Sequence, residues 1–537
     1  MRFFDPACGS GNFLTETYVS IRRLENLVLL ELNQGQISFA DESISPIRVS
    51  IAQFYGIEIN DFAVTVAKTA LWIAESQMMQ ETETVVKMNL DFLPLKTNTN
   101  IIEGNALRMN WEEVCPKFDH LYIMGNPPFL GFTYMNKSQK SDMASLFPGT
   151  KNLDYVCGWY KKASDYIKDS TIECGFVSTN SITQGETVAS LWKHINIKIN
   201  FAYRTFIWDS EANQKAHVHC VIIGFADFNR NEKMLFENDT CQKVNNINAY
   251  LVNAPNIIVA SRNKPLCDIS PMIIGNKPAD GGHLIIEEDD YYTFIEKDKN
   301  SLQFIKPLLG AVEFLHNKKR WCLWLVGASP SDIQKCPLVM DRIQKCKESR
   351  LSSKAEGIRK FAKTPALFAQ VTQPVGADFI LIPRVSSEKR DYIPMSFLDG
   401  NTIVTDAVQI VPNASIYEFG IITSNVHMAW MRTVCGRMKS DYRYSKDVVY
   451  NNFPWPEPTD EQKAKIEQTA QQILDVRAKY PDCSLADLYD DLVMPSDLRE
   501  AHRANDRAVM QAYGFPIKMT ESECVAEFMK MYENLTK

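Results

Sequence analysis

The first 225 residues alternate short apolar runs with longer stretches in which apolar residues recur every three or four positions. The short runs are typical of β-strands and the longer stretches of amphipathic helices. Strands that alternate with helices predict an α/β fold with a parallel, doubly wound sheet. We predict helices at about 12–33, 61–79 and 153–168, and strands at MRFF, QFYGIEI, NIIEGNA, HLYIMGN, CGFVSTN and AHVHCVIIGF, the last as an antiparallel edge strand.

The pattern becomes irregular after about residue 230. Short apolar runs such as LVNAPNIIVA and NTIVTDAVQIV are separated by segments rich in Asn and Pro, which predicts an α+β or β-rich domain. The proline-rich NNFPWPEPTD is typical of a linker, and the amphipathic stretch after it opens with an N-cap residue, Thr459. We therefore expect an α/β domain at 1–228, a second domain at 229–455 and a helical C-terminal segment at 456–537.

Composition narrows the class of protein. The chain of 537 residues is 45% hydrophobic, which is typical of a globular protein of roughly three domains. It has no run of about 18 uncharged apolar residues and no apolar signal sequence, so we expect a cytoplasmic protein.

The 13 cysteines are scattered and never spaced as CxxC, so we expect no disulfide framework. His217 and His219 have no third ligand nearby in sequence, so we expect no metal site.

The charge is distributed unevenly. The net charge of −7 argues against a uniformly basic nucleic-acid binder, but residues 226–455 hold 29 basic and 25 acidic side chains. Within them, residues 313–390 hold fifteen basic and seven acidic side chains. Such a stretch can follow a phosphate backbone or can form a solvated helix face, and charge alone does not decide between the two.

The segment FFDPACGSGNF places glycines between a predicted strand and a predicted helix. In an open α/β sheet this is where an adenosine-bearing cofactor binds, because glycines let the backbone approach the ligand closely. The spacing differs from the GxGxxG pattern that cradles a pyrophosphate, and favours a cofactor without phosphates such as S-adenosylmethionine. The expected cofactor-binding residues of this loop are Asp5, Ala7, Gly9, Gly11, Asn12 and Phe13.

Two later strands end in polar residues that suit the same ligand. Glu58, in YGIEIN, lies where a carboxylate can accept hydrogen bonds from both ribose hydroxyls, with Ile59 beside it. Asn105, in IIEGNAL, can hold the adenine amino group, and Ala106 leaves room for the ring. The alternatives are a solvent-facing glutamate and an ordinary loop asparagine.

The fourth strand ends in GNPPF, which presents hydrogen-bond acceptors. Proline fixes φ, biases Asn126 towards an extended conformation and has no N–H of its own. The side-chain oxygen of Asn126 and the carbonyl of Pro127 can therefore accept both hydrogens of one NH₂ group. That leaves the nitrogen lone pair free to attack a methyl donor. With Pro128, they form the expected catalytic motif, and Phe129 offers a face on which a planar base can stack.

An amine in duplex DNA is paired, so the target base must first be flipped out of the helix, at a cost of a few kcal/mol. Phe206 or Trp208, in RTFIWDSEA, can supply the second wall of the base pocket, although either can equally be a core residue.

The motifs DPACGSG, GIEI, GNAL and NPPF, in this order, resemble those of the DNA amino-methyltransferases of the N6-adenine type. The segments EANQKAHVHCVIIGF, IPRVSSEKRDYIPMSF, GRMKSDYRYSKDVVYNNFPWP and LYDDLVMPSDLREAHRANDRAV are similar to the MmeI-like single-chain restriction–modification enzymes. The resemblance covers nearly the whole chain. It implies a methyltransferase domain followed by a target-recognition domain and a helical C-terminal segment, with S-adenosylmethionine as cofactor and double-stranded DNA as partner.

The resemblance also implies roles for the basic residues and a difference at the front of the chain. The expected DNA contacts are Arg384, Lys389, Arg390, Arg437, Lys439, Arg443 and Lys446. Family members carry a nuclease domain and a helical domain before the glycine loop, whereas this chain begins four residues before Asp5. We therefore expect a truncated form that does not cleave DNA.

The resulting hypothesis is a DNA adenine-N6 methyltransferase of a restriction–modification system. Cytosine-N4 methylation remains open, since the NPPF motif suits any such amine, and glutamine and RNA methyltransferases share the motif too. A truncated, non-catalytic DNA-specificity module is the alternative from a different class.

Overall fold

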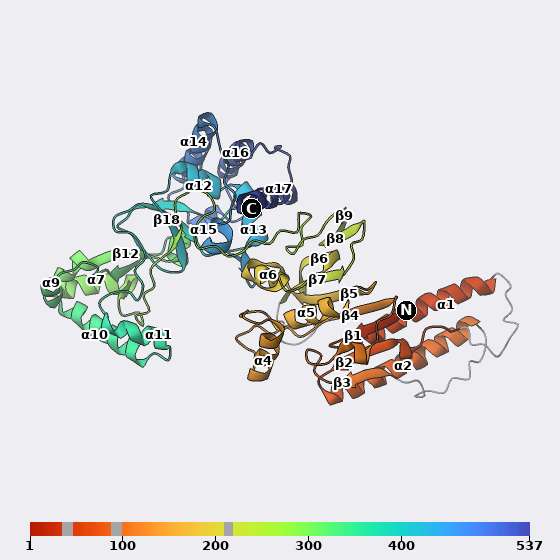
Figure 1. Cartoon of the computed structure of the whole chain (residues 1–537). Helices are drawn as coiled ribbons and strands as arrows, with labels where there is room; N and C mark the ends of the chain where they lie inside the picture. The colour runs from red at the N-terminus through yellow and green to blue at the C-terminus, as the bar shows by residue number, and fades with distance from the viewer. Residues whose placement is uncertain (35–46, 87–98, 209–217) are drawn as a thin grey trace. The chain divides into compact units, whose positions relative to one another are not determined.

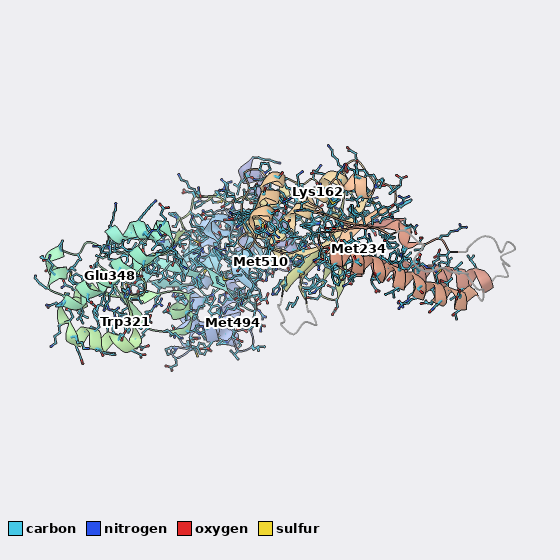
Figure 2. All side chains as sticks on the ribbon, turned by 90° about the horizontal axis from the view of Figure 1, so that it is seen from below. Lys162, Met234, Trp321, Glu348, Met494 and Met510 are labelled. Atoms are coloured by element: carbon cyan, nitrogen blue, oxygen red, sulfur yellow. The ribbon has the colours of Figure 1, made fainter. Side chains whose placement is uncertain are left out.

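The structure is a computed structural model that describes residues 1–34, 47–86, 99–208 and 218–537. It divides into two compact units, Met1–Ile258 and Val259–Lys537. Within each unit, side chains fill the space between the elements (Figure 2). No helix among the described residues is long and apolar enough to cross a membrane.

The first unit is built on a nine-stranded sheet in the order β3-β2-β1-β4-β5-β7-β6-β8-β9. The first five strands pair in parallel, as predicted for a doubly wound sheet. The strands are β1 (Arg2–Asp5), β2 (Phe54–Glu58), β3 (Asn100–Glu103), β4 (Leu121–Gly125), β5 (Glu173–Thr179), β6 (Lys198–Trp208), β7 (Val218–Ala226), β8 (Lys233–Glu237) and β9 (Thr240–Val244).

Helices cover both faces of this sheet because neighbouring residues of a strand point to opposite sides. Phe3 stacks on Phe54 in the core beneath two long helices that pack side by side (Figure 1). Phe4 contacts Trp111 and Tyr166 on the other face. The helices of the unit are α1 (Asn12–Gln34), α2 (Asp61–Val86), α3 (Trp111–Val114), α4 (Lys137–Leu146), α5 (Cys157–Tyr166) and α6 (Gly185–Trp192).

The end of the sheet differs from the prediction. β7 is antiparallel to β5, as predicted, but it is not an edge strand, because β6 pairs with its other side and β8 and β9 follow. The sequence pattern did not predict β6. This strand contains two register shifts, and the ring of Phe201 lies where a side chain on Gly224 of β7 would be. The irregular strand is therefore stabilised by a contact that alternation of polar and apolar residues does not reveal.

Helix α2 extends beyond its predicted end at residue 79. Its last turns are held to α1 by a buried polar cluster in which Thr82 donates to Asn26 and accepts a hydrogen bond from Arg22. Buried polar residues interrupt the apolar periodicity, so the prediction stopped too early.

The second unit combines helices with small sheets, in agreement with the predicted α+β domain. It contains two four-stranded sheets and a three-stranded sheet, in the orders β10-β18-β14-β16, β11-β13-β12-β17 and β15-β20-β19. In one layer, Trp321 of β13 (Figure 2) stacks on Tyr291 with ring centroids 3.8 Å apart. The strands are β10 (Ile273–Ile274), β11 (Ile285–Glu287), β12 (Ile305–Leu309), β13 (Arg320–Leu323), β14 (Phe379–Pro383), β15 (Val385–Ser386), β16 (Ser396–Leu398), β17 (Ile403–Val404), β18 (Val408–Pro412), β19 (Gly436–Met438) and β20 (Asp441–Arg443).

The predicted C-terminal helices pack against helices of this same unit. Thr459 caps α14, as the sequence suggested, and Gly420 of α12 lies against Ile466 and Ala470 of α14. The helices of the unit are α7 (Glu288–Lys297), α8 (Ala311–His316), α9 (Pro330–Gln334), α10 (Pro337–Ser352), α11 (Glu356–Arg359), α12 (Ile416–Ile422), α13 (Asn425–Val434), α14 (Asp460–Arg477), α15 (Leu485–Leu488), α16 (Ser496–Ala512) and α17 (Glu521–Thr536).

Candidate functional site

The loop between β1 and α1 adopts a backbone conformation that requires glycine. Gly9 and Gly11 have φ values of +53° and +84°. A Cβ atom on Gly11 would also lie 3.0 and 3.1 Å from the Cβ and Cα atoms of Ala67 in α2. The loop is tied to the neighbouring strand, because Cys8 N donates to Ile57 O at 3.0 Å. The predicted glycine turn is therefore a fixed feature of the carboxyl edge of the sheet.

Glu58 ends β2 beside this loop. Its Oε2 accepts a hydrogen bond from Gly9 N at 3.0 Å, and its Oε1 accepts one from Asn60 N at 3.0 Å. Each carboxylate oxygen has a second lone pair, so both can still accept a hydrogen bond from a ligand.

A cavity of about 440 Å³ opens between the ends of β1, β2, β3 and β4. Seven of the predicted site residues line it: Ala7, Glu58, Ile59, Asn105, Ala106, Asn126 and Pro128. The other lining residues are Pro6, Ile57, Gly104, Asn136, Ser138, Gln139, Asp142, Tyr155 and Trp159. The side chains brought together thus come from four strand ends, from α4, and from α5 and the segment that leads into it.

Asp5 lies beneath the cavity wall rather than in it. It is 1% exposed, and its Oδ1 accepts a hydrogen bond from Ala7 N at 2.9 Å. Burial, partly offset by this hydrogen bond, raises the pKa of Asp5 from 3.8 to about 7, and the nearby Glu58 adds to the rise. A Cβ atom on Gly125 would lie 2.6 Å from Asp5 Oδ1, so Asp5 packs directly against the strand end that carries Asn126.

Asn126 lines the cavity and has an unused acceptor. Its Oδ1 is buried and has no hydrogen-bond partner within the described part of the chain. The residues that follow are fixed, because Leu130 N donates to Asp154 Oδ1 and Tyr155 N donates to Leu130 O, both at 3.0 Å. A buried acceptor without a partner costs about 1–3 kcal/mol, and such an atom in a cavity marks a place where a ligand can donate.

A polar cluster that the sequence analysis did not identify closes the β3 side of the cavity. Asp142 of α4 accepts hydrogen bonds from Asn105 Nδ2 at 3.1 Å, Arg108 Nε at 2.7 Å and Tyr155 Oη at 3.2 Å. Next to it, Trp159 Nε1 donates to Pro6 O at 3.0 Å. No motif accompanies Asp142 in the sequence, and its burial is seen only in the structure.

The two aromatic residues predicted for the base pocket do not reach the cavity. Phe206 and Trp208 lie near each other on β6, with ring centroids 6.3 Å apart. β5 and β7 separate β6 from β4, and neither residue lines the cavity. Phe129 follows Pro128, which lines the cavity, but Phe129 is not itself one of the lining residues.

The basic residues predicted to contact DNA belong to the second unit, where two segments far apart in sequence meet on the sheet β15-β20-β19. Three of them already have partners: Arg384 donates to Asp406 O, Arg437 pairs with Glu388, and Lys446 pairs with Asp447. Within the described part of the chain, the side chains of Lys389, Lys439, Arg443 and Arg390 have no ion pair or hydrogen bond. The first three are exposed and Arg390 is half-buried.

Another basic residue of the stretch 313–390 is structural. Arg350 is 0% exposed, and its guanidinium donates to five carbonyl oxygens, including those of Ala279 and Leu367. The high density of positive charge in the sequence therefore overstates the charge available to a ligand.

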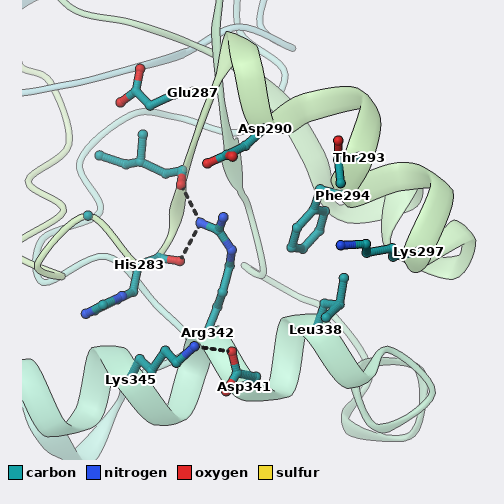
Figure 3. Close-up of a pocket in the computed structure, with 12 residues that line it drawn as sticks. His283, Glu287, Asp290, Thr293, Phe294, Lys297, Leu338, Asp341, Arg342 and Lys345 are labelled. Atoms are coloured by element: carbon teal, nitrogen blue, oxygen red, sulfur yellow. Dashed lines mark hydrogen bonds and ion pairs between the residues drawn. The ribbon is translucent and has the colours of Figure 1, made fainter.

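A second hollow, of about 550 Å³, lies between α7 and α10 (Figure 3). Its cations are occupied near the centre: Arg342 donates to the carbonyls of His283 and Ile285, and Lys345 pairs with Asp341. None of its described side chains has a buried polar atom without a partner. The hollow therefore lacks the unused acceptor that distinguishes the first cavity.

The metal prediction concerned two histidines, of which His217 lies outside the described residues. Among the described residues, no three His, Cys, Asp or Glu side chains are grouped as metal ligands.

Known proteins match the chain along its whole length. Residues 1–237 match the family model described as the MmeI DNA-methyltransferase domain, residues 253–457 the MmeI target recognition domain and residues 458–537 the MmeI C-terminal domain. A relative named DNA methyltransferase A, from Bacillus subtilis (strain 168), is 40% identical over 100% of this chain. The chain spans 62% of the length of that relative.

Among solved structures, the type IIL restriction–modification enzyme MmeI in complex with DNA superposes with a TM-score of 0.89 at 41% identity. The superposition covers 100% of this chain and 73% of that one. The three family models, in this order along one chain, and the likeness to a solved member lead to the same conclusion: the chain belongs to the MmeI family.

Proposed function

We propose that the protein is a DNA methyltransferase of a restriction–modification system that moves a methyl group from S-adenosylmethionine to N6 of a flipped-out adenine. In this proposal residues 1–228 carry the reaction, residues 229–455 recognise the DNA sequence and residues 456–537 form a helical support. The Oδ1 of Asn126, which is buried beside the cavity and has no partner among the described residues, carries the proposal. It is an acceptor at the place where the target amine would enter.

Asn126 and Pro127 act on the amine together. The Oδ1 of Asn126 and the carbonyl of Pro127 accept its two hydrogens and draw the nitrogen lone pair out of conjugation with the ring. The lone pair would then point towards the methyl carbon of the donor. As the N–C bond forms, the bond between that carbon and the donor's sulfur would break, and the surplus proton on the amine would pass to water. Holding the reacting atoms about 3–3.5 Å apart and in line can supply roughly 7–11 kcal/mol of the barrier.

The residues of the cavity fit S-adenosylmethionine, which would supply the methyl group as a sulfonium. The glycine loop admits a ligand close to the backbone, and Glu58 retains two lone pairs for ribose hydroxyls. Ile59 and Ala106 offer apolar surface for the adenine ring. The name of the relative DNA methyltransferase A supports this choice of reaction.

The remaining predicted residues have subordinate roles in the proposal. Phe129 stacks on the flipped base, and Phe206 or Trp208 can form a second wall only if β6 approaches the base in the complex. The exposed cations Lys389, Lys439 and Arg443 contact DNA.

The test is methyl transfer to plasmid DNA. The full chain is incubated with tritiated S-adenosylmethionine, and the DNA is digested to nucleosides and separated by chromatography. Label in N6-methyldeoxyadenosine supports the proposal. Label in N4-methyldeoxycytidine would replace adenine by cytosine as the target, and absence of label with DNA binding intact would favour the non-catalytic specificity module.

Substitution tests the amine-binding role. We expect Asn126→Ala to lower kcat by at least about 100-fold, because the amine loses one of its two acceptors. DNA affinity should change little. Asn196→Ala, an exposed asparagine of the same unit, is the control and should retain full activity. Retention of most activity by Asn126→Ala would exclude this role for the residue.

A further inference from the structure

The cavity contains a buried carboxylate to which the proposed reaction assigns no role. Asp142 is 7% exposed, lines the cavity from α4 and receives three hydrogen bonds from side chains, those of Asn105, Arg108 and Tyr155. An ionised carboxylate offers about four lone-pair positions. Three donors therefore fix the orientation of Asp142 and leave it able to accept one more hydrogen bond from the cavity.

Asn105 is oriented by the same cluster. Its Oδ1 accepts a hydrogen bond from Leu107 N at 3.0 Å, and its Nδ2 donates to Asp142 Oδ2 at 3.1 Å. These two hydrogen bonds distinguish the oxygen of the Asn105 side-chain amide from its nitrogen. The second N–H of Nδ2 therefore remains as a donor. The carbonyl oxygen of Asn105 keeps one lone pair, but the carboxylate of Asp142 beside it is the stronger acceptor.

The cluster joins two elements that line the cavity. Arg108 follows β3 and donates to Asp142 and to Ser138 Oγ at 2.6 Å, so it joins the strand end to α4. The carboxylate thus sits one strand beyond Glu58, on the side away from the glycine loop. In an open α/β sheet, ligands bind in the crevice at the carboxyl ends of the strands, so a ligand whose ribose lies at Glu58 can place its base beside Asp142, which lines the same cavity.

We propose that Asp142 accepts a hydrogen bond from the exocyclic amine of the cofactor's adenine while Asn105 Nδ2 donates to ring nitrogen N1. The inference rests on the proposed cofactor and deepens it. An acceptor beside a donor matches the edge of adenine, with its amino group beside N1. Hypoxanthine presents the reverse pattern, a carbonyl oxygen beside an N1–H, and would place its oxygen against the Asp142 carboxylate.

The test compares two ligands on the full chain by titration calorimetry: S-adenosylhomocysteine and S-inosylhomocysteine, which differ in this edge alone. We expect the native protein to bind the adenosyl ligand at least 100-fold more tightly, because a site with buried polar groups rejects a ligand that leaves them unpaired. Asp142→Asn should weaken adenosyl binding by about tenfold or more and leave inosyl binding unchanged or improved.

Asp165→Asn is the matched control. It removes the same charge from α5, where Asp165 is exposed and pairs with Lys161, and both affinities should stay at the native values. Asp142→Ser is a second variant that should lose the same preference. The ratio of two affinities measured on one preparation does not depend on the fraction of folded protein, so a loss of stability does not mimic the expected result.

Two results would overturn the role of Asp142 alone: equal binding of both ligands by the native protein, or an equal loss of both affinities in Asp142→Asn and Asp142→Ser, which indicates a purely structural residue. If the native protein binds neither ligand, the proposed cofactor is wrong and this inference fails with it.

Discussion

The residues of the cavity differ in whether other groups of the protein already form hydrogen bonds with their polar atoms. Both oxygens of Glu58 accept backbone hydrogen bonds, and Asp142 has three side-chain donors. Asn126 Oδ1 is buried and accepts no hydrogen bond from any residue that the structure describes. Glu58 and Asp142 therefore owe their positions to the protein alone, whereas Asn126 gains a partner only from a ligand.

Asp5 makes the stability of the protein depend on pH. Its pKa is raised from 3.8 to about 7 chiefly by burial, so the folded state disfavours the ionised form. Protonation therefore contributes stability that is fully present below about pH 3.8 and is lost as the pH rises to about 7. In Asp5→Asn, which keeps an acceptor for Ala7 N, this loss is absent.

We expect the free energy of unfolding of Asp5→Asn, measured with urea, to rise relative to that of the native protein between pH 5 and pH 7, and the difference to level off above about pH 7. The comparison removes the pH dependence of all other groups, which the two proteins share. A difference that stays constant across this range would show that Asp5 is ionised throughout.

At the scale of elements, the glycine loop fixes how closely β1, α1 and α2 approach one another. Gly9 and Gly11 both have positive φ, but only Gly11 lies against another helix, at Ala67. We expect Gly9→Ala to lower the free energy of unfolding by about 1 kcal/mol, from backbone strain alone. Gly11→Ala should lose roughly 2–4 kcal/mol, because the added methyl also displaces α2.

Urea unfolding of the two variants checks this order. Gly9→Ala serves as the control, since nothing lies within 4 Å of its added Cβ atom. Equal losses of stability would show that α2 moves away at no cost, and that the loop does not set its position.

The elements that the sequence predicted share one property: local pattern and local chemistry agree. β1 to β5 are short apolar runs that each end in a turn residue. The sequence therefore predicted the strands, their parallel direction and the sheet edge at which they end. The same reasoning placed Ala7, Glu58, Asn105 and Asn126 at one edge, and all four line the cavity.

What the sequence could not predict depends on contacts between distant segments. Asp142 is one acid among many until folding places α4 over the end of β3. β6 depends on the fit of Phe201 over Gly224. The placement of Phe206 and Trp208 away from the cavity follows from the position of β6 in the sheet order, which local periodicity does not encode.

At the scale of the whole molecule, the net charge is negative, whereas the sheet β15-β20-β19 exposes positive charges. The chain carries −7 overall, yet on the sheet β15-β20-β19 the exposed cations Lys439 and Arg443 have no anionic partner among the described residues. Their neighbour Arg437 pairs with Glu388 and lies 4.4 Å from the centroid of the Tyr442 ring, so it stabilises the sheet instead. Cations that pair with an anion of the protein are therefore structural, and cations without such a partner are the candidate DNA contacts.

This separation predicts how DNA affinity depends on salt. Each phosphate contact contributes about one unit to the slope of log K against log salt concentration, because a bound cation is released from the DNA. The double variant Lys439→Ala/Arg443→Ala should therefore lower the slope by about two units on any duplex. Lys530→Ala/Lys537→Ala removes the same net charge from side chains that pair with Glu527 and Glu533. If both double variants change the slope equally, affinity follows the total charge of the chain, and the small sheet is not the surface that meets the phosphates.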